Sequence, residues 1–316
     1  MNRLMIIVPC YNEAAVFPES AAQLLDVLKN LIKQGKVCDN SGILFVNDGS
    51  KDSTWELICR AHSIDTHLYG LNLAGNVGHQ NALLAGIDTV KDICDISISI
   101  DADLQDDVAV IEQMVDKYNA GADIVYGVRS ERKTDSFFKR FTAQSFYKMM
   151  SWLGVKSVYN HADYRLMSAR AMQQLCRYKE RNLFLRGIVP QIGYKTDCVY
   201  YARKERKAGE SKYPLKKMFS FAWDGITSFS VRPITLISIL GSVIIFCSII
   251  AFIYTLISWL CGNTVPGWPS LMISIWFLGG VQLLSVGIVG QYVGKTYIES
   301  KERPRYNIEE FLDHED

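Results

Sequence analysis

The first two thirds of the chain alternate short apolar runs with amphipathic segments. Four apolar runs, at residues 4–8, 43–46, 67–71 and 96–100, have the length of buried strands. Apolar residues recur at helical spacing in residues 24–32 and again in 82–87. Strands that alternate with helices are typical of a mostly parallel sheet with helices on its faces. We therefore expect an α/β domain over residues 1–214.

The pattern changes after residue 232. From Pro233 to Gly294 the chain carries no Asp, Glu, Lys, Arg or His. Residues 233–260 and 271–294 each exceed the roughly 20 residues that a helix needs to cross a bilayer. The connection at 261–270 is rich in glycine and proline, which form turns. The sequence predicts a two-helix transmembrane hairpin; a buried hairpin of a soluble protein is the alternative.

Basic residues flank this hairpin on both sides, whereas the connecting loop is uncharged. The flanking residues are Lys212, Lys216, Lys217 and Arg232 before the first helix, and Lys295, Lys301, Arg303 and Arg305 after the second. Positive charge favours the cytoplasmic side. We therefore expect residues 1–214 and a tail at 295–316 in the cytoplasm, with the loop at 261–270 outside.

Residues 215–232 show apolar positions at three- and four-residue spacing, with two lysines off that face. This pattern predicts an amphipathic helix that lies in the membrane surface next to the first transmembrane helix. A helix that packs against protein would show the same pattern.

Charge, cysteine spacing and the absence of two nucleotide-binding motifs disfavour several classes of function. The formal net charge is +1, so no overall field favours nucleic acid. The eight cysteines contain no C-x-x-C pair, which disfavours a zinc or redox site. The run at 4–8 is too short for a signal peptide. Neither a dinucleotide-binding glycine motif nor a P-loop is present, which disfavours nicotinamide enzymes and P-loop ATPases.

Polar clusters follow all four predicted strands. They span residues 9–13, 47–50, 75–80 and 101–105. Ligands bind at the carboxyl ends of strands in such sheets, so we expect the clusters to form one site. Asp101 and Asp103 alternate directly after the fourth strand, and paired carboxylates select hard cations such as Mg²⁺ or Mn²⁺. A metal there would stabilise a diphosphate leaving group.

Taken together, these motifs resemble the second family of glycosyltransferases, which has the Rossmann-like GT-A fold. The matching segments are Val8–Glu13, Asn47–Ser50, Gly78–Gln80, Asp101–Gln105, Gly127–Arg129, Asp163–Met167 and Arg206–Tyr213. With two transmembrane helices after them, the chain looks like the polyprenyl-phosphate glycosyltransferases, such as bactoprenol glucosyltransferases and enzymes similar to dolichol-phosphate-mannose synthase. The resemblance covers essentially the whole chain.

The resemblance implies a role for each matching residue. It assigns donor binding to Pro9, Tyr11, Asn12, Glu13, Asp48, Ser50, Gln80, Asp101, Ala102 and Asp103. It assigns the metal to Asp101, Asp103 and Gln105. Asp163 and Arg165 match the catalytic D-F-R segment, in which Tyr164 replaces the usual phenylalanine. Arg129, Arg206, Ser211 and Lys212 are the candidates for the acceptor phosphate.

The resemblance also implies the reaction: inverting transfer of a hexose to undecaprenyl phosphate, giving a lipid-linked sugar for the cell envelope. UDP-glucose is the favoured donor, UDP-N-acetylglucosamine the next, and a tetramer the expected assembly. Asp163 either removes a proton or orients the acceptor. Two alternatives stay open: a processive polysaccharide synthase, although the chain has no Arg-Trp pair of the Q-x-x-R-W segment, and a non-catalytic nucleotide-sugar-binding partner of a lipid flippase.

Overall fold

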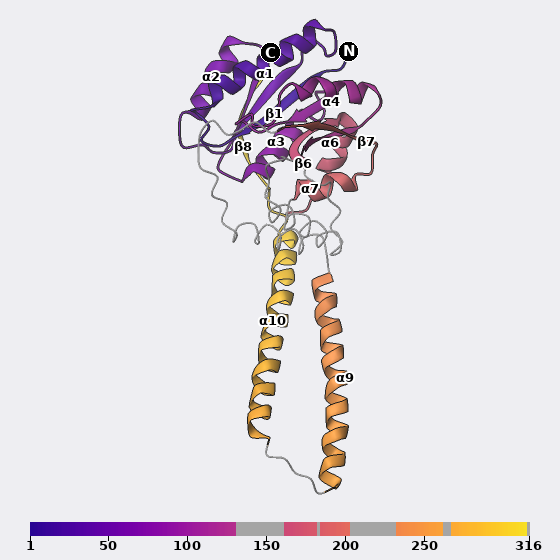
Figure 1. The fold of residues 1–316 in the computed structure, drawn as a ribbon. Helices are drawn as coiled ribbons and strands as arrows, with labels where there is room; N and C mark the ends of the chain where they lie inside the picture. The colour runs from indigo at the N-terminus through magenta and orange to yellow at the C-terminus, as the bar shows by residue number, and fades with distance from the viewer. Residues whose placement is uncertain (131–160, 182–183, 203–231, 262–266, 315–316) are drawn as a thin grey trace. The chain divides into compact units, whose positions relative to one another are not determined.

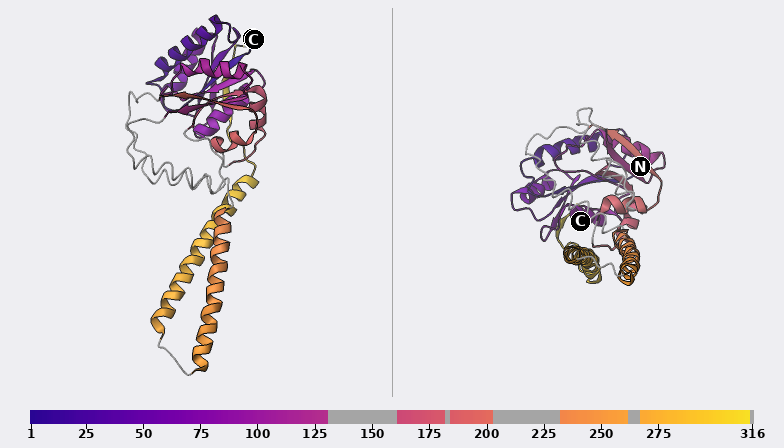
Figure 2. Two further views of the ribbon diagram at one scale, coloured as in Figure 1. Left: turned by 45° about the vertical axis from the view of Figure 1, so that its right-hand side comes forward. Right: turned by 60° about the horizontal axis from the view of Figure 1, so that its bottom comes forward.

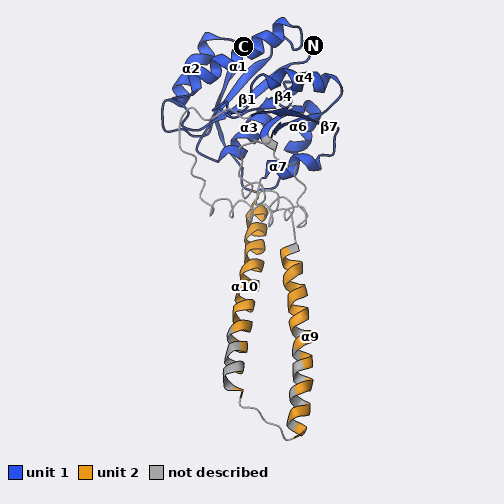
Figure 3. Cartoon of the chain, viewed as in Figure 1, with its two compact units in different colours: residues 1–147, 156–213, 303–316 blue, residues 148–155, 214–302 orange. Residues whose placement is uncertain are grey.

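The chain forms two compact units, coloured separately in Figure 3. The computed structural model describes residues 1–130, 161–181, 184–202, 232–261 and 267–314. The first unit comprises residues 1–147, 156–213 and 303–316, and the second comprises 148–155 and 214–302. The C-terminal residues thus belong to the same unit as the predicted α/β domain.

One eight-stranded sheet organises the described part of the first unit, in the order β7-β5-β6-β4-β1-β2-β3-β8 (Figures 1 and 2). The strands are β1 (Leu4–Cys10), β2 (Gly42–Asn47), β3 (Leu68–Leu73), β4 (Ile96–Ser99), β5 (Ile124–Arg129), β6 (His161–Ser168), β7 (Thr196–Tyr201) and β8 (Ile308–Leu312). The helices are α1 (Phe17–Lys33), α2 (Thr54–Ile64), α3 (His79–Val90), α4 (Val110–Asn119), α6 (Ala169–Cys176) and α7 (Leu185–Ile188), with a 3₁₀ turn η1 (Val189–Gln191).

The predicted α/β class is confirmed. The four predicted strands are β1 to β4, and the two helical stripes lie in α1 and α3. β1 pairs in parallel with β2 and β4, and β2 pairs in parallel with β3. Among the described strands only β6 and β8 run against their neighbours, so the sheet is mostly parallel.

Alternate residues of β1 pack against different helical layers. Leu4, Ile6 and Val8 belong to a core cluster with residues of α1 and α4. Ile7 faces α3, where Gly86 permits a close approach: an added Cβ would lie 2.5 Å from Ile7 Cγ2 and 2.9 Å from Val46 Cγ2. Because α3 follows β3 in the chain after a short loop, its first residues lie near the carboxyl end of that strand.

The predicted cytoplasmic tail contains a strand that the sequence pattern did not reveal. β8 pairs antiparallel with β3 and forms one edge of the sheet. The amide of Ala74 donates to the carbonyl of Asn307 at 3.0 Å, and the Tyr306 hydroxyl donates to Asp88 at 2.6 Å. These contacts attach residues that follow the last long helix to the α/β domain.

The second unit contains two long helices that contact each other, α9 (Arg232–Leu260) and α10 (Trp268–Ser300). Among residues whose side chains are described, Phe277–Ser300 is long and apolar enough to cross a membrane, with a mean hydropathy of 1.4, and Pro233–Ile244 is a shorter apolar helix. Both predicted helical segments are therefore helices, and α10 continues past the expected end at residue 294. Of the predicted surface helix at 215–232, residues 215–231 lie outside the described residues.

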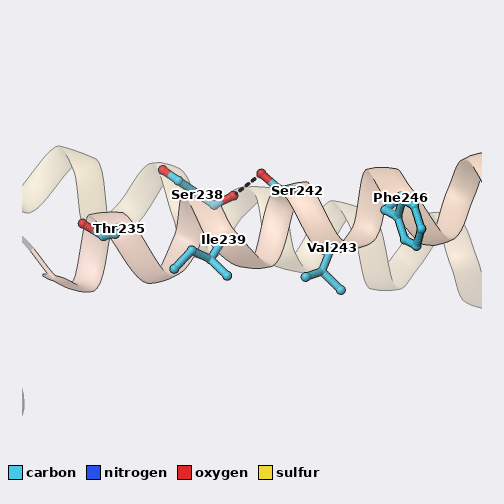
Figure 4. A pocket seen from close by; sticks show the side chains of 6 residues that line it. All are labelled: Thr235, Ser238, Ile239, Ser242, Val243 and Phe246. Atoms are coloured by element: carbon cyan, nitrogen blue, oxygen red, sulfur yellow. Dashed lines mark hydrogen bonds between the residues drawn. The ribbon is translucent and has the colours of Figure 1, made fainter.

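A groove follows one face of α9 (Figure 4). It is lined by Thr235, Ser238, Ile239, Ser242, Val243 and Phe246, which recur at three- and four-residue spacing. The Ser242 hydroxyl donates to the Ser238 carbonyl at 2.9 Å, and the Ser238 hydroxyl donates to the Ile234 carbonyl at 3.1 Å. Bonding within the helix lets such hydroxyls lie in an apolar segment.

Candidate active site

Hydrogen bonds join the segment after β1 to the segment after β2. The amide of Asn12 donates to Ser50 Oγ at 3.0 Å, and the amide of Lys51 donates to Asn12 Oδ1 at 2.8 Å. Asn12 has a left-handed φ of 55°, which asparagine tolerates better than most residues. The amide of Glu13 donates to Thr54 Oγ1 at 3.0 Å. The first two polar clusters therefore form one connected structure, as the sequence predicts.

The segment after β2 is bound in turn to the segment after β3. The buried carboxylate of Asp48 accepts backbone hydrogen bonds from Val77 at 2.7 Å and Gly78 at 3.0 Å. Burial raises the pKa of Asp48, although these two amides act in the opposite direction. Gly49 has a φ of 62°, and a Cβ there would lie 2.5 Å from the backbone nitrogen of Asn76. The close contact of the two loops therefore requires glycine at position 49.

Three further residues assigned to the donor differ in exposure. Pro9 is buried within β1. Ala102 is 5% exposed, and its carbonyl accepts a hydrogen bond from Ser20 Oγ at 2.6 Å. Tyr11 is 43% exposed just after β1, so its ring is open to a stacking base. We expect Tyr11 to contact a donor directly, and Pro9 and Ala102 to shape the backbone beside it.

Gln80 connects the site to a helix that the sequence analysis did not consider. Its Oε1 accepts a hydrogen bond from the amide of Leu185, the first residue of α7, at 2.9 Å. The side chain of Gln80 thus positions α7, which is a different use from the expected contact with the donor.

Asp101 and Asp103 follow β4 at the same edge of the sheet, in an acidic environment. The side chain of Asp101 is 41% exposed, and Asp101 Oδ1 lies 3.4 Å from His79 Nε2. Although the side chain is partly exposed, the surrounding protein removes water from the carboxyl group and so raises the pKa of Asp101; the carboxylates of Asp163 and Asp106 add to this effect while His79 opposes it. Such crowding of carboxylates is the arrangement that a divalent cation relieves.

The residues present fit a metal that binds together with a substrate. Among the described residues, no three His, Cys, Asp or Glu side chains form a group that could hold a metal. Magnesium commonly takes one or two carboxylates and completes its shell with phosphates and water. Gln105, the expected third ligand, is only 5% exposed. Asp101, Asp103 and Gln105 stay the candidate ligands.

Asp163 lies on β6 and has two arginine partners. Arg165 Nη2 donates to Asp163 Oδ1 at 2.8 Å, and Arg186 Nη2 donates to Asp163 Oδ2 at 3.0 Å. Burial by itself would raise the pKa of Asp163, but the two guanidinium groups outweigh it and hold the pKa well below the ordinary value. Asp163 is therefore a weak base.

The alternation of β6 explains the three residues of the catalytic segment. Asp163 and Arg165 share one side of the sheet, and Arg165 is 2% exposed. Tyr164 points to the opposite side, in the core cluster, and its hydroxyl donates to the carbonyl of Asp107 at 3.1 Å. The hydroxyl that distinguishes Tyr164 from the usual phenylalanine is therefore satisfied, and it lies on the other side of the sheet from Asp163.

Two residues at this site received no role in the sequence analysis. His79 Nε2 lies 3.4 Å from Asp101 and 3.9 Å from Asp163, so it connects the acidic pair to the catalytic segment. Arg186 belongs to α7, and its side chain is 42% exposed. The sequence does contain one indication of this role: Arg186 is the only charged residue in the apolar run 183–189. A single charge in such a run needs a partner of opposite charge.

The four candidates for the acceptor phosphate separate into two groups. Arg129 donates from Nε and Nη2 to the two carboxylate oxygens of buried Asp106, at 3.0 and 3.1 Å. This bidentate pair already uses the edge of Arg129 that best fits a phosphate, so we no longer propose it as a ligand. Arg206, Ser211 and Lys212 lie outside the described residues.

Comparisons with known proteins identify the family of this chain. The sequence model of "Glycosyl transferase family 2" matches residues 5–176. An "Uncharacterized glycosyltransferase YkoT" of Bacillus subtilis is 56% identical, over 97% of this chain and 91% of its own length. A "Prophage bactoprenol glucosyl transferase homolog" of Escherichia coli is 39% identical, over 97% of this chain and 98% of its own length.

Among solved structures, the mannosyltransferase PcManGT of Pyrobaculum calidifontis, in complex with GDP-Man and Mn²⁺, is 15% identical. It aligns with a TM-score of 0.43 over 95% of this chain and 86% of that chain. The family model covers more than half of the chain, and the Bacillus and Escherichia relatives align with nearly all of it. The chain therefore belongs to glycosyltransferase family 2.

Proposed function

We propose that this glycosyltransferase transfers glucose from UDP-glucose to undecaprenyl phosphate at the cytoplasmic face of the membrane, with inversion at the anomeric carbon. UDP-N-acetylglucosamine is the next candidate donor. Support comes from the near full-length similarity to relatives named bactoprenol glucosyl transferase in Escherichia coli and Shigella phages. The product would be a lipid-linked sugar that a later glycosylation step consumes.

The observation that carries the proposal is the environment of Asp163. Arg165 and Arg186 keep this carboxylate ionised and make it a poor acceptor of protons. A hydroxyl acceptor would need a strong base, whereas a phosphate monoester, with a second pKa near ~6, is already mostly anionic at neutral pH. The site therefore suits a phosphate acceptor better than the sugar hydroxyl that a processive synthase extends.

In the proposed reaction, a phosphate oxygen of the lipid forms a bond to the anomeric carbon while the bond from that carbon to the UDP oxygen breaks. Tyr11 and the loop of Asp48 hold the nucleotide. Asp163 orients Arg165 and Arg186 near the reacting groups, so that their charge balances the anionic acceptor. A divalent cation held by Asp101 and Asp103 would neutralise the diphosphate as it leaves.

The helices α9 and α10 are proposed to span the membrane, which would bring the catalytic unit to its lipid substrate. The span Phe277–Ser300 and the apolar helix Pro233–Ile244 support this placement. The uncharged loop at 261–270 would lie outside the cell, and both chain ends would lie in the cytoplasm.

Purified protein in lipid nanodiscs tests the function directly. With UDP-glucose labelled in the sugar, undecaprenyl phosphate and Mg²⁺ or Mn²⁺, we expect label to enter the lipid fraction. EDTA and the variant Asp103→Ala should each reduce the transfer by about 10² or more. UDP-N-acetylglucosamine tested in parallel identifies the preferred sugar.

Undecaprenol, which lacks the phosphate, is the matched control acceptor. We expect no transfer to it, because Arg165 and Arg186 hold the pKa of Asp163 low and make it a poor base for deprotonating a hydroxyl. Equal transfer to undecaprenol would reject the phosphate acceptor. Absence of transfer from every nucleotide-sugar, with nucleotide binding intact, would favour the non-catalytic alternative.

A further inference from the structure

The C-terminal strand β8 reaches the donor side of the sheet through one side chain. Glu309 Oε2 accepts a hydrogen bond from Asn72 Nδ2 at 2.9 Å. Asn72 Oδ1 accepts in turn from Asn47 Nδ2 at 2.7 Å, and Asn47 Oδ1 accepts from the amide of Ser50 at 3.3 Å. Three consecutive hydrogen bonds therefore connect the strand after α10 with residues 47–50, which we name the donor loop.

The direction of this chain is set at its two ends, because the Glu309 carboxylate can only accept a hydrogen bond and the Ser50 amide can only donate one. A carboxylate only accepts hydrogen bonds, whereas an amide side chain can present either its oxygen or its nitrogen. Glu309 therefore requires Asn72 to present its nitrogen to β8 and its oxygen to Asn47. Asn47, which is 3% exposed, must then present its oxygen to the Ser50 amide. A reversal of either amide would place two donors or two acceptors against each other.

The pairing of β8 with β3 places Glu309 beside Asn72. Leu71 lies opposite Phe311 and Asn72 opposite Glu310, and the register then shifts, so that Leu73 lies opposite Ile308 and Glu309 is the extra residue at this irregularity. Gly70 makes room for the strand, since a Cβ at this position would lie 3.1 Å from Leu312 Cδ1. Neighbouring contacts of Tyr306 and Asn307 hold the segment before β8.

We propose that Glu309 is a positioning residue for nucleotide binding, which acts through Asn72 and Asn47 on the shape of the donor loop. This inference rests on the proposed function, because that function places the donor at residues 47–50. The segment after the last long helix thereby takes part in the donor site, although none of its residues needs to touch the nucleotide.

Kinetics of full-length variants test the proposal. Glu309→Ala should raise the KM for UDP-glucose and the Kd for UDP by about three- to tenfold, the effect of one lost hydrogen bond, with kcat changed less than about twofold. Glu309→Gln retains an acceptor oxygen and should restore both values to within about twofold of wild type. Glu310→Ala, on the same exposed strand, is the control and should change neither.

The outcomes separate this inference from the proposed function. If wild-type protein transfers no sugar, the function fails, but the Kd for UDP still tests Glu309. An unchanged KM and Kd in Glu309→Ala would overturn the proposal, as would an equal effect of Glu310→Ala. A lower melting temperature of Glu309→Ala with an unchanged KM for UDP-glucose would also contradict the proposal, because it would show that Glu309 only stabilises the attachment of β8 to the sheet.

Discussion

Asp163 accepts hydrogen bonds from Arg165, two residues away on β6, and from Arg186 on α7. The pKa of Asp163 in the folded protein lies below the ordinary value of ~3.9, so this carboxyl group binds a proton more readily in the unfolded chain. The stabilisation by this carboxylate is therefore fully present above pH ~5 and is lost only as the pH falls towards the lowered pKa. Asp163 should therefore keep a constant negative charge between about pH 6 and 9.

The variant Asp163→Asn tests its role. Removing the charge leaves Arg165 buried without its carboxylate, so we expect the free energy of unfolding to fall by about 3–5 kcal/mol. Turnover should fall by about 10² or more while the donor Kd stays within a few fold, because the donor loop is untouched. Thermal unfolding, calorimetry with UDP and single-turnover transfer measure the three quantities.

The pH profile of the wild-type protein gives an independent control. Because Arg165 and Arg186 hold the pKa of Asp163 low, turnover should show no limb from this group between about pH 6 and 9, and a limb assigned to Asp163 in that range would contradict this environment. Wild-type turnover in Asp163→Asn would mean that the phosphate acceptor needs no help from Asp163, and its assignment would be withdrawn. A loss of donor affinity alone would place Asp163 in the donor or metal shell instead.

The loops after β1, β2 and β3 act as one element because each is bonded to the next. The amide of Asn12 donates a hydrogen bond to Ser50 Oγ, and the carboxylate of Asp48 accepts hydrogen bonds from the amides of Val77 and Gly78. Sequence spacing predicted that these loops meet at one edge, since carboxyl ends of parallel strands share an edge. The individual bonds depend on loop conformations such as the left-handed Asn12 and Gly49, which spacing does not specify.

The variant Gly49→Ala tests the contact between the second and third loops. Its Cβ would approach the Asn76 nitrogen to 2.5 Å at a φ of 62°. We expect the free energy of unfolding to fall by about 1–3 kcal/mol and the donor KM to rise. Gly75→Ala in the neighbouring loop is the matched control, because a Cβ there meets nothing within 4 Å. Equal stability of the two variants would show that the loops move apart without cost.

At the scale of the whole molecule, the chain combines an α/β unit with a unit of two long helices. The segment after α10 belongs to the α/β unit, so the chain passes from that unit to the helices and returns. If both helices cross the membrane, this path is possible only with an even number of crossings. The return of β8 to the sheet is therefore consistent with the proposed hairpin, in which both flanks lie on the same side of the membrane.

Labelling of Cys261 tests this topology. Cys261 directly follows α9 and is exposed. In intact cells, a membrane-impermeant maleimide should label Cys261, whereas Cys38, which is partly exposed in the α/β unit, should react only after the cells are lysed. The variant Cys261→Ser should abolish the label on intact cells. Labelling of Cys38 in intact cells would reject the proposed orientation.

The sequence by itself determined the fold class and the strands β1 to β4, and it predicted that the polar clusters after them meet at one edge of the sheet. Apolar residues in these segments indicate which positions are buried, and the spacing of the apolar residues indicates whether the segment is a strand or a helix. The paired Asp101 and Asp103 were likewise visible, because both lie in one short segment. Each of these inferences depends on residues close together in the chain.

Only the tertiary structure decided which distant residues meet. Arg186 reaches Asp163 from a helix of four residues, too short for a periodic signal. β8 pairs with a strand more than 200 residues earlier, and its five residues Ile308–Leu312 include two adjacent glutamates that obscure any alternation. Charge partners and edge strands are chosen by three-dimensional proximity, so local pattern does not encode them.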